Sequence, residues 1–163
     1  MEHPILNSSV SGDETSLTMH KDHNIGIAMD TPRGLLVPNI KGVQGMSLFE
    51  IGAALSELQA KGAANKLGAE ELTGGTITVS NMGSLGGTVL SPVITSPQVA
   101  IVALGRIQNL PRYGPSGEVV PSKVMNASWA GDHRVIDGAT MARFVNTWRR
   151  FLENPTLMLG HLK

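Results

Sequence analysis

Apolar residues recur along the chain at two spacings, one typical of helices and one typical of strands. After Ser47 the apolar positions follow a helical face, at Ile51, Leu55 and Leu58. Ser47 and Glu50 have the spacing of a capping box, in which each side chain bonds the backbone of the other residue. We therefore predict a helix over residues 48–61, ended at Gly62.

A second amphipathic helix is predicted near the C-terminus. Its apolar face is formed by Met141, Phe144, Val145, Trp148 and Leu152. Asp137 is placed to cap its beginning, and the Asn154–Pro155 pair is placed to end it, because a residue before proline is disfavoured in a helix. The aromatic stripe of this helix is expected to lie in the core.

Three strand regions are predicted in the second half of the chain. Residues 76–80 are rich in β-branched side chains, and residues 99–104 are wholly apolar, as in a strand buried on both faces. A further strand region covers residues 118–129, with Pro121 near its start, where an edge or a bulge tolerates proline.

The first forty residues predict less regular structure. Residues 1–23 are polar and are expected to hold one short strand at most, followed by a turn. In residues 24–40 two apolar stretches flank a turn at 31–34, which predicts a hairpin. Strands, hairpins and two helices in this order predict an α+β domain, in which helices pack on a mixed sheet. At 163 residues the chain fits a single domain.

Composition narrows the classes of partner. The 13 Lys+Arg balance the 13 Asp+Glu, so a broad basic field for nucleic acid or an anionic membrane is not expected. Charged residues make up 16% of the chain, against about 25% in a typical soluble domain, which favours extra buried surface in an oligomer. No apolar run reaches the roughly 20 residues needed to span a bilayer, and the first residues resemble no signal or transit peptide, so we expect a soluble protein.

The chain has no cysteine, so any thiol in its chemistry must arrive on a substrate. His133 lies in a polar loop between a predicted strand and the last helix, where catalytic side chains are often found. The glycine-rich stretch 83–87 lacks the lysine of a phosphate-binding loop. His20 and His23 have no third ligand nearby, so no metal site is expected.

Seven segments, in order, carry a resemblance to a known family: PILNSSV, NIGIAMDT, GLLVPNI, LTGGTITVSNMGSLGGT, SPVI, NASWAGDHRVIDGATMARF and FLENP. Together, from about residue 4 to residue 163, they resemble the dihydrolipoamide acyltransferases of 2-oxo acid dehydrogenase complexes. The amino-acid sequence of the segments is closest to the branched-chain type. The resemblance implies a chloramphenicol acetyltransferase-like catalytic domain. It implies transfer of an acyl group between dihydrolipoamide and coenzyme A.

The resemblance also assigns roles to residues. A thiolate is the nucleophile in such a transfer, and a histidine suits the removal of the thiol proton, so His133 is expected to be the general base. The hydroxyl of Ser80 is expected to stabilise the oxyanion, and Asp137 to organise the histidine loop. The residues implied to contact coenzyme A are Asp30, Gln59, Ser80, Asn81, Gly105 and Ile107.

Assembly is implied in the same way. Family members form trimers with the active site between neighbouring subunits, and trimers build a cubic core of about 24 subunits. Relative to a complete family member, we expect residues 1–163 to be a partial catalytic domain, without the lipoyl domain that carries the lipoyl group and without the subunit-binding domain. Through those absent domains the expected partners are the 2-oxo acid decarboxylase and dihydrolipoamide dehydrogenase. The expected compartment is the mitochondrial matrix, with the bacterial cytoplasm as the alternative.

Some alternatives remain open. Leu90 is larger than the residue usual at this place in branched-chain members, which puts the acyl preference in doubt and leaves acetyl- or succinyl-specific transfer possible. A chloramphenicol-type O-acetyltransferase would share the HxxxDG motif. A noncatalytic structural subunit of the same core is the third alternative, although such proteins commonly lose the histidine.

Overall fold

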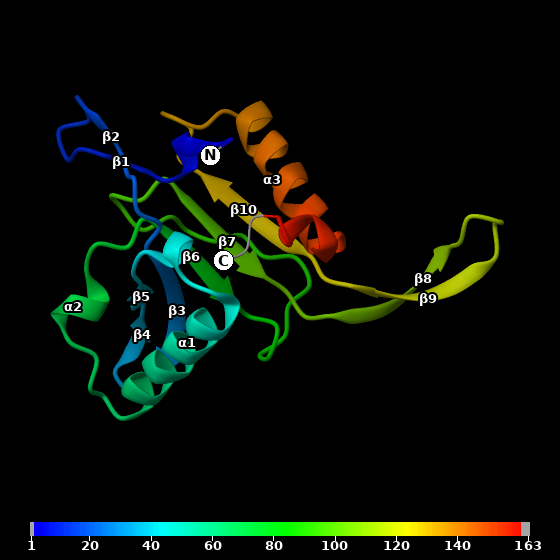
Figure 1. The fold of residues 1–163 in the computed structure, drawn as a ribbon, viewed down its shortest axis with the longest axis horizontal. Coiled ribbons are helices and arrows are strands. Elements are labelled where there is room, and N and C mark those ends of the chain that lie inside the picture. The colour runs from blue at the N-terminus through cyan, green and yellow to red at the C-terminus, as the bar shows by residue number, and fades with distance from the viewer. Residues whose placement is uncertain (1, 161–163) are drawn as a thin grey trace.

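A six-stranded mixed sheet forms the centre of the structure, a computed structural model that describes residues 2–160 (Figure 1). The strands follow the order β10-β7-β6-β3-β4, and β5 also pairs with β3. β3, β6 and β7 are parallel, whereas the other pairs are antiparallel. The strand bounds are β3 (Ile25–Thr31), β4 (Gly34–Leu36), β5 (Asn39–Ile40), β6 (Ile77–Asn81), β7 (Ala100–Leu104) and β10 (Ala127–Gly131). The mixed sheet and the hairpin of β3 with β4 confirm the predicted α+β class.

The first long helix, α1 (Leu48–Ala63), begins as predicted and runs two residues past the predicted end. Its capping box is present: the hydroxyl of Ser47 accepts from the Glu50 amide at 3.3 Å, and the Glu50 carboxylate accepts from the Ser47 amide at 2.7 Å. The helix buries Leu58 in a cluster with Ile40 and Leu67. The short helix α2 (Ala69–Leu72) was not predicted.

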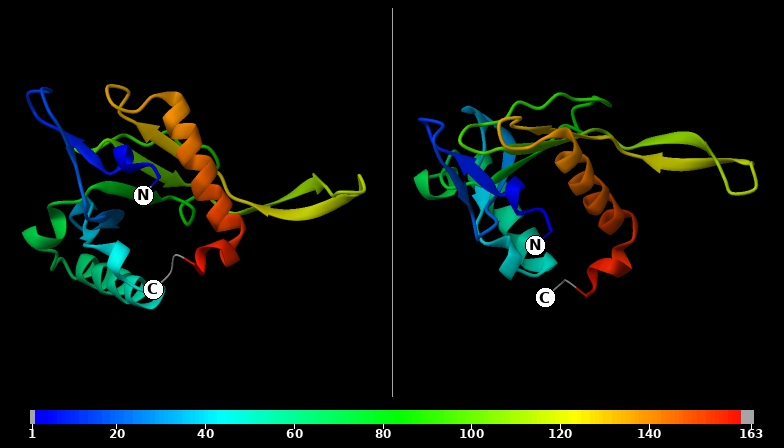
Figure 2. Two further views of the ribbon diagram at one scale, coloured as in Figure 1. Left: turned by 45° about the horizontal axis from the view of Figure 1, so that its top comes forward. Right: turned by 90° about the horizontal axis from the view of Figure 1, so that it is seen from above.

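The last long helix, α3 (Gly138–Glu153), confirms the second helix prediction and lies on β10. The Trp129 ring meets the rings of Phe144 and Trp148 edge-on, with centroids 4.9 and 5.5 Å apart. Seen from above, α1 and α3 lie on the same side of the sheet (Figure 2, right). On the other side, Thr78 donates to the Gln98 side chain at 2.7 Å, so the connection between β6 and β7 crosses that face.

The strand region predicted over residues 118–129 is wrong as a single element. It is divided into β9 (Val119–Val124) and β10, and β9 pairs with a strand that was not predicted, β8 (Gln108–Tyr113). The β8–β9 hairpin extends away from the sheet in every view (Figures 1 and 2). Pro111 lies opposite Pro121 in it, which a two-stranded ribbon with two open edges tolerates.

The N-terminal region holds more structure than the one short strand predicted. β1 (Ser8–Val10) and β2 (Leu17–Met19) form a two-stranded sheet after the 3-10 turn η1 (Pro4–Leu6). Leu6 is 2% exposed and packs with Val99, Ala100 and Ile136. Two further 3-10 turns are η2 (Val43–Gly45) and η3 (Pro155–Met158). The N-terminal segment is thus part of the core beneath α3.

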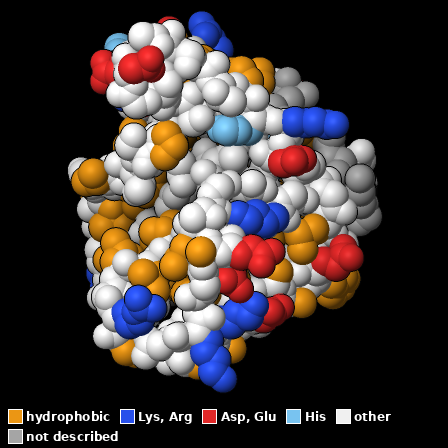
Figure 3. All heavy atoms as spheres, turned by 90° about the vertical axis from the view of Figure 1, so that its left-hand side faces the viewer, with side chains coloured by type: hydrophobic (Ala, Val, Ile, Leu, Met, Phe, Trp, Pro, Cys, Tyr) orange, Lys and Arg blue, Asp and Glu red, His pale blue; other side chains and the backbone are white. Residues whose placement is uncertain are grey.

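Charges are mixed on the surface that includes α2 and β4. Lys, Arg, Asp and Glu side chains lie interspersed there, without a large area of one sign (Figure 3). Such a surface offers no extended electrostatic footprint for a polyanion. Within residues 2–160, the helices all fall short of the length and apolar character that crossing a bilayer requires.

Candidate active site

His133 is displayed on a tight turn that joins β10 to α3. The Asp132 amide donates to the Val99 carbonyl at 2.8 Å, and the Ile136 amide donates to the Asp132 carbonyl at 2.8 Å. Ile136 is 2% exposed and anchors the turn in the core. His133 itself is exposed, and its ring makes no hydrogen bond to any residue in the range 2–160. The imidazole is therefore available to a substrate.

Arg134 holds the same turn from the outside. Its guanidinium donates to both carboxylate oxygens of Asp132, at 3.0 Å from Nε and 2.6 Å from Nη2, and it also pairs with Glu14 of the N-terminal hairpin. These hydrogen bonds lower the pKa of Asp132. Exposed ion pairs contribute little stability individually, so the main consequence is positional: the turn cannot rotate freely beside His133.

Asp137 caps the beginning of α3, as predicted from its position before the helix. Its carboxylate accepts from the Thr140 amide at 2.6 Å. That hydrogen bond is the largest cause of a lowered pKa of Asp137, and the nearby Arg143 and His133 lower it further. The residue is thus an ionised carboxylate next to the histidine turn, and capping leaves it able to influence the imidazole electrostatically.

Two substitutions separate the capping role of Asp137 from a catalytic one. Asparagine also caps helices well, so Asp137→Asn should retain the melting temperature and lose less activity than His133→Ala. Asp137→Ala should melt a few degrees lower, by about 2–5 °C at pH 7. Because the folded pKa of Asp137 is lowered, its stabilisation is present above the unfolded pKa of about 3.9 and is lost as pH falls through the folded pKa. Calorimetry from pH 7 to pH 2.5 should show the difference disappear. Equal losses of activity in Asp137→Asn and His133→Ala would contradict this ranking.

Ser80 lies near the carboxyl end of β6, between Ala28 of β3 and Ala103 of β7. It is half-buried, and within residues 2–160 its hydroxyl has no hydrogen-bond partner. A serine at the end of a strand often bonds nearby backbone, but the Ser80 hydroxyl makes no such bond to the described residues. A hydroxyl without an internal partner is free to donate to a substrate oxygen.

Ser80 and His133 lie at opposite ends of the sheet within one chain. Ser80 is in register with Ala103, which is in register with Ser128, whereas the histidine turn follows Gly131, the partner of Ala100. Along the strands, the position of Ser80 and the start of the histidine turn are three residues apart, which is about 10 Å. Across the sheet, they are two strands apart, which adds about another 10 Å sideways. Direct contact between the two side chains inside a single chain is therefore excluded.

Three of the residues implied for coenzyme A line one cavity. Asp30, Gln59 and Asn81 come from β3, α1 and the end of β6, and they surround a space of about 520 Å³ between the sheet and α1. The neighbours of Ser80, Val79 and Asn81, line it, but Ser80 itself does not. Gly105 and Ile107 also lie outside its walls; Gly105 is buried, and Ile107 is 67% exposed.

The sequence did not point to several other residues of this cavity. Ser84 lies in the glycine-rich loop and adds a hydroxyl to the wall, and its only signal was its place between glycines. Met29, Leu55 and Leu104 add apolar surface, and nothing in their own segments distinguished them from core residues. A cavity with apolar walls and a few convergent polar groups is typical of ligand sites.

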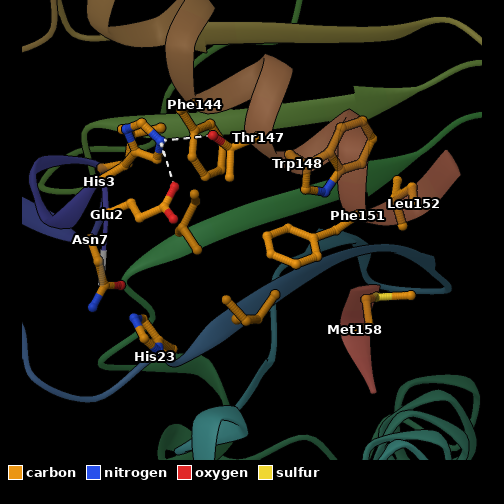
Figure 4. Close-up of a pocket in the computed structure, with 13 residues that line it drawn as sticks. Glu2, His3, Asn7, His23, Phe144, Thr147, Trp148, Phe151, Leu152 and Met158 are labelled. Carbon is orange, nitrogen blue, oxygen red and sulfur yellow. Dashed lines mark hydrogen bonds and ion pairs between the residues drawn. The ribbon is translucent and has the colours of Figure 1, made fainter. Parts of the chain in front are cut away.

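A larger cavity of about 750 Å³ lies elsewhere, between α3 and the N-terminal segment (Figure 4). Phe144, Trp148 and Phe151 line it, and His3 bonds Thr147 at its polar end. None of the predicted site residues lines it, so size alone does not identify the reactive centre. Within residues 2–160, no group of three or more His, Cys, Asp or Glu side chains could hold a metal ion.

Comparison with known sequences gives a family match over nearly the whole chain. Residues 1–160 match the family described as 2-oxoacid dehydrogenases acyltransferase (catalytic domain). The lipoamide acyltransferase component of the mouse branched-chain alpha-keto acid dehydrogenase complex, a mitochondrial protein, is 55% identical over 163 residues, which is 100% of this chain and 34% of the relative. The chain thus spans about a third of the length of that relative.

Solved structures agree with the sequence match. The dihydrolipoamide acetyltransferase of Azotobacter vinelandii, studied for the role of a serine, a histidine and an asparagine in its mechanism, superposes with a TM-score of 0.91 at 37% identity, over 97% of this chain and 65% of its own. The cubic core of a pyruvate dehydrogenase complex gives 0.91 at 36%, over the same shares. Chloramphenicol acetyltransferase, at 16% identity and a TM-score of 0.58 over 93% of this chain and 71% of its own, shares the fold.

Proposed function

The chain belongs to the family of the catalytic domain of 2-oxoacid dehydrogenase acyltransferases. We therefore propose that it transfers a branched-chain acyl group between dihydrolipoamide and coenzyme A. The observation that carries the proposal is an exposed histidine in the family's HxxxDG turn, whose ring has no hydrogen-bond partner among residues 2–160, on a fold shared with solved acyltransferase cores. A noncatalytic subunit could keep the turn for its packing and for the Asp137 cap, but it would not need the histidine.

In the proposed reaction, His133 removes the proton of the incoming thiol, and the thiolate attacks the thioester carbonyl carbon. The carbonyl oxygen becomes an oxyanion and accepts a hydrogen bond from the Ser80 hydroxyl. When the tetrahedral intermediate collapses, the carbon–sulfur bond of the leaving thiolate breaks, and that thiolate takes the proton back from the imidazolium. The ionised Asp137 favours the imidazolium while it exists.

The spacing of these residues supports the assignment. In the Azotobacter enzyme the histidine and the asparagine under study are four residues apart, and the serine precedes the histidine by 52 residues. Here His133 and Asp137 are also four apart, and Ser80 precedes His133 by 53. The aspartate in place of the asparagine adds a negative charge next to the imidazole.

The cavity of about 520 Å³ is proposed to hold the pantetheine arm of coenzyme A. Its amide groups need donors and acceptors along a narrow path, and Asp30, Gln59 and Asn81 offer both kinds. The apolar wall formed by Leu55 and Leu104 suits the methylene groups of the arm.

We propose that the site is completed between two copies of the chain, with His133 of one copy facing Ser80 of the next in a trimer. The separation of the two residues within one chain requires this arrangement if both act on one thioester. Exposed apolar side chains on the connection between β6 and β7, Leu85, Val89 and Val93, are 73%, 78% and 82% exposed and suit such an interface. A cubic core of trimers, with the decarboxylase and dihydrolipoamide dehydrogenase as partners in a mitochondrial matrix complex, belongs to the same proposal.

Complementation tests this arrangement. The variants His133→Ala and Ser80→Ala should each be nearly inactive alone. Co-expressed in equal amounts, they should recover about a quarter of the parent activity, because random assortment places an intact histidine opposite an intact serine at about a quarter of interfaces. The matched control replaces the His133→Ala partner with the double variant, which offers no intact pair. A mixture no more active than this control would refute the shared site.

The acyl group is the second point to test. Leu90 is half-buried, and one of its methyl carbons lies 2.9 Å from the position a Gly87 Cβ would take, so its side chain folds against its own loop. The leucine side chain is thus turned toward Gly87, and its effect on the acyl preference is a matter for measurement. Isobutyryl, acetyl and succinyl thioesters should therefore be compared as donors. A preference for the acetyl or succinyl donor would correct the proposed substrate. Supplying chloramphenicol as the acceptor tests the O-acetyltransferase alternative. No transfer from any donor would favour the structural subunit.

A further inference from the structure

The glycine-rich loop that follows Ser80, residues 82–90, is fixed to the sheet at its start and its middle. The Met82 amide donates to the Leu104 carbonyl at 3.0 Å, and the Arg106 amide donates to the Gly87 carbonyl at 3.0 Å. Both contacts involve the end of β7 and the residues just after it. The loop therefore crosses from the end of β6 past the neighbouring strand.

Two side chains at the beginning of β10 hold the far end of the loop. The Asn126 side-chain amide donates to the Thr88 carbonyl at 2.8 Å, and the Ser128 hydroxyl accepts from the Leu90 amide at 3.2 Å. The Asn126 carbonyl also accepts from the Gly105 amide at 2.9 Å, which fixes its own backbone. The loop is thus bonded at two points, two residues apart, by side chains that lie outside it.

The loop backbone packs closely on the residues that follow β7. A Cβ on Gly105 would lie 3.1 Å from the Thr88 carbonyl oxygen and 3.2 Å from the Gly87 carbonyl oxygen. A Cβ on Gly83 would lie 3.0 Å from the Gly105 carbonyl oxygen. Backbone approaches of this kind need glycine, so displacement of the loop toward the sheet meets immediate steric resistance.

The serine that holds the loop and the serine of the proposed oxyanion site share one face of the sheet. Ser80, Ala103 and Ser128 are in register across β6, β7 and β10, so their side chains point to the same side. That side is opposite the helices, because Trp129, the next residue, packs on α3. Ala103 between them is only 3% exposed. The loop thus begins two residues after Ser80 and, at Leu90, reaches the face of the sheet to which the Ser80 side chain points, opposite α1 and α3.

From these contacts, and resting on the proposed function, we infer that Asn126 and Ser128 are positioning residues: they hold the glycine-rich loop so that the hydroxyl of Ser80 stays aimed at the thioester oxygen. Neither residue lines the cavity proposed for coenzyme A. Their loss should thus impair the chemical step more than coenzyme A binding.

The test uses an isosteric substitution of Asn126 and two substitutions of Ser128, all in the assembled protein. Asn126→Asp keeps the shape but faces the Thr88 carbonyl with an oxygen in place of a donor. Ser128→Ala removes the acceptor, and Ser128→Thr retains a hydroxyl. Exposed residues of the same types on the helices provide the controls Asn146→Asp and Ser56→Ala. The measurements are kcat, KM for coenzyme A, melting temperature and amide hydrogen exchange of Leu90 and Arg106.

We expect Asn126→Asp and Ser128→Ala to lower kcat by about tenfold with KM changed less than about twofold, to leave the melting temperature at the level of the controls, and to speed exchange of the Leu90 amide. Ser128→Thr should restore both kcat and exchange. A loss of kcat no greater than the loss of folded protein, or exchange equal to that of the controls, would overturn the inference. If the parent transfers no acyl group, the proposed function fails separately, and amide exchange alone then decides whether Asn126 and Ser128 hold the loop.

Discussion

Replacing His133 with alanine is expected to lower kcat for acyl transfer by about 10²- to 10⁴-fold, the range supplied by a general base. The side chain is exposed on a turn anchored by Ile136, so its removal leaves the fold and the melting temperature unchanged. The measurement is thioester exchange between an isobutyryl donor and coenzyme A, followed by the free thiol released, in the assembled protein.

The matched control is His20→Ala. His20 is also a histidine near the surface, but its ring bonds the Ser9 hydroxyl at 3.0 Å in the N-terminal hairpin, far along the chain from the turn. It should retain nearly the full rate. Transfer by His133→Ala at the parental rate would remove the histidine from the mechanism, whatever rate the His20→Ala control shows.

The second large effect is expected for Ser80→Ala, which should lower kcat by about 10²- to 10³-fold, as the loss of an oxyanion donor does elsewhere. KM for coenzyme A should change little, because Ser80 does not line the cavity proposed for the substrate arm. Initial rates over a range of coenzyme A concentrations give both constants.

Ser84→Ala provides the contrast for Ser80→Ala. Ser84 does line the cavity, so its loss should raise KM and spare kcat. If Ser80→Ala raised KM alone, the hydroxyl would be a binding group, and the charge of the intermediate would have to be stabilised by another donor.

Local signals in the sequence predicted the long elements well. The capping box at Ser47 and the apolar periodicity after it gave α1 within two residues, and Asp137 with the Met–Phe–Trp stripe gave α3. The apolar run 99–104 gave the buried centre of the sheet. In each case the information lies within a few residues, so no knowledge of the partner segments is needed.

The β8–β9 hairpin was missed because its signals are not local. Each of its strands contains a proline, and β8 has no regular alternation of exposed and half-buried positions, so neither its period nor its composition indicates a strand. β9 does alternate, and it was predicted, but only as part of the longer strand region 118–129. Only the pairing itself, which places Pro111 opposite Pro121, makes the ribbon. The N-terminal strands are only three residues long each, too short for a periodic pattern, and their pairing also comes from tertiary structure.

For the site, the sequence predicted which residues are present but not how they are arranged. His133 and Ser80 could be assigned roles by resemblance, yet their placement at opposite ends of the sheet depends on strand order. Likewise, Asp30, Gln59 and Asn81 meet only because β3, α1 and β6 converge. Asn126 and Ser128 had no signal beyond two polar residues before Trp129.

The order of the projecting β8–β9 ribbon is expected to depend on protein concentration. An isolated two-stranded ribbon is barely stable in water, and this one presents Tyr113 and Val119 at 82% and 66% exposure. In the proposed trimer, we expect such an arm to gain its order by docking on a second copy. In dilute solution, where copies separate, the arm is then the segment that frays first, and cleavage by a protease near residues 113–119 reports dissociation before any loss of the central sheet is detectable.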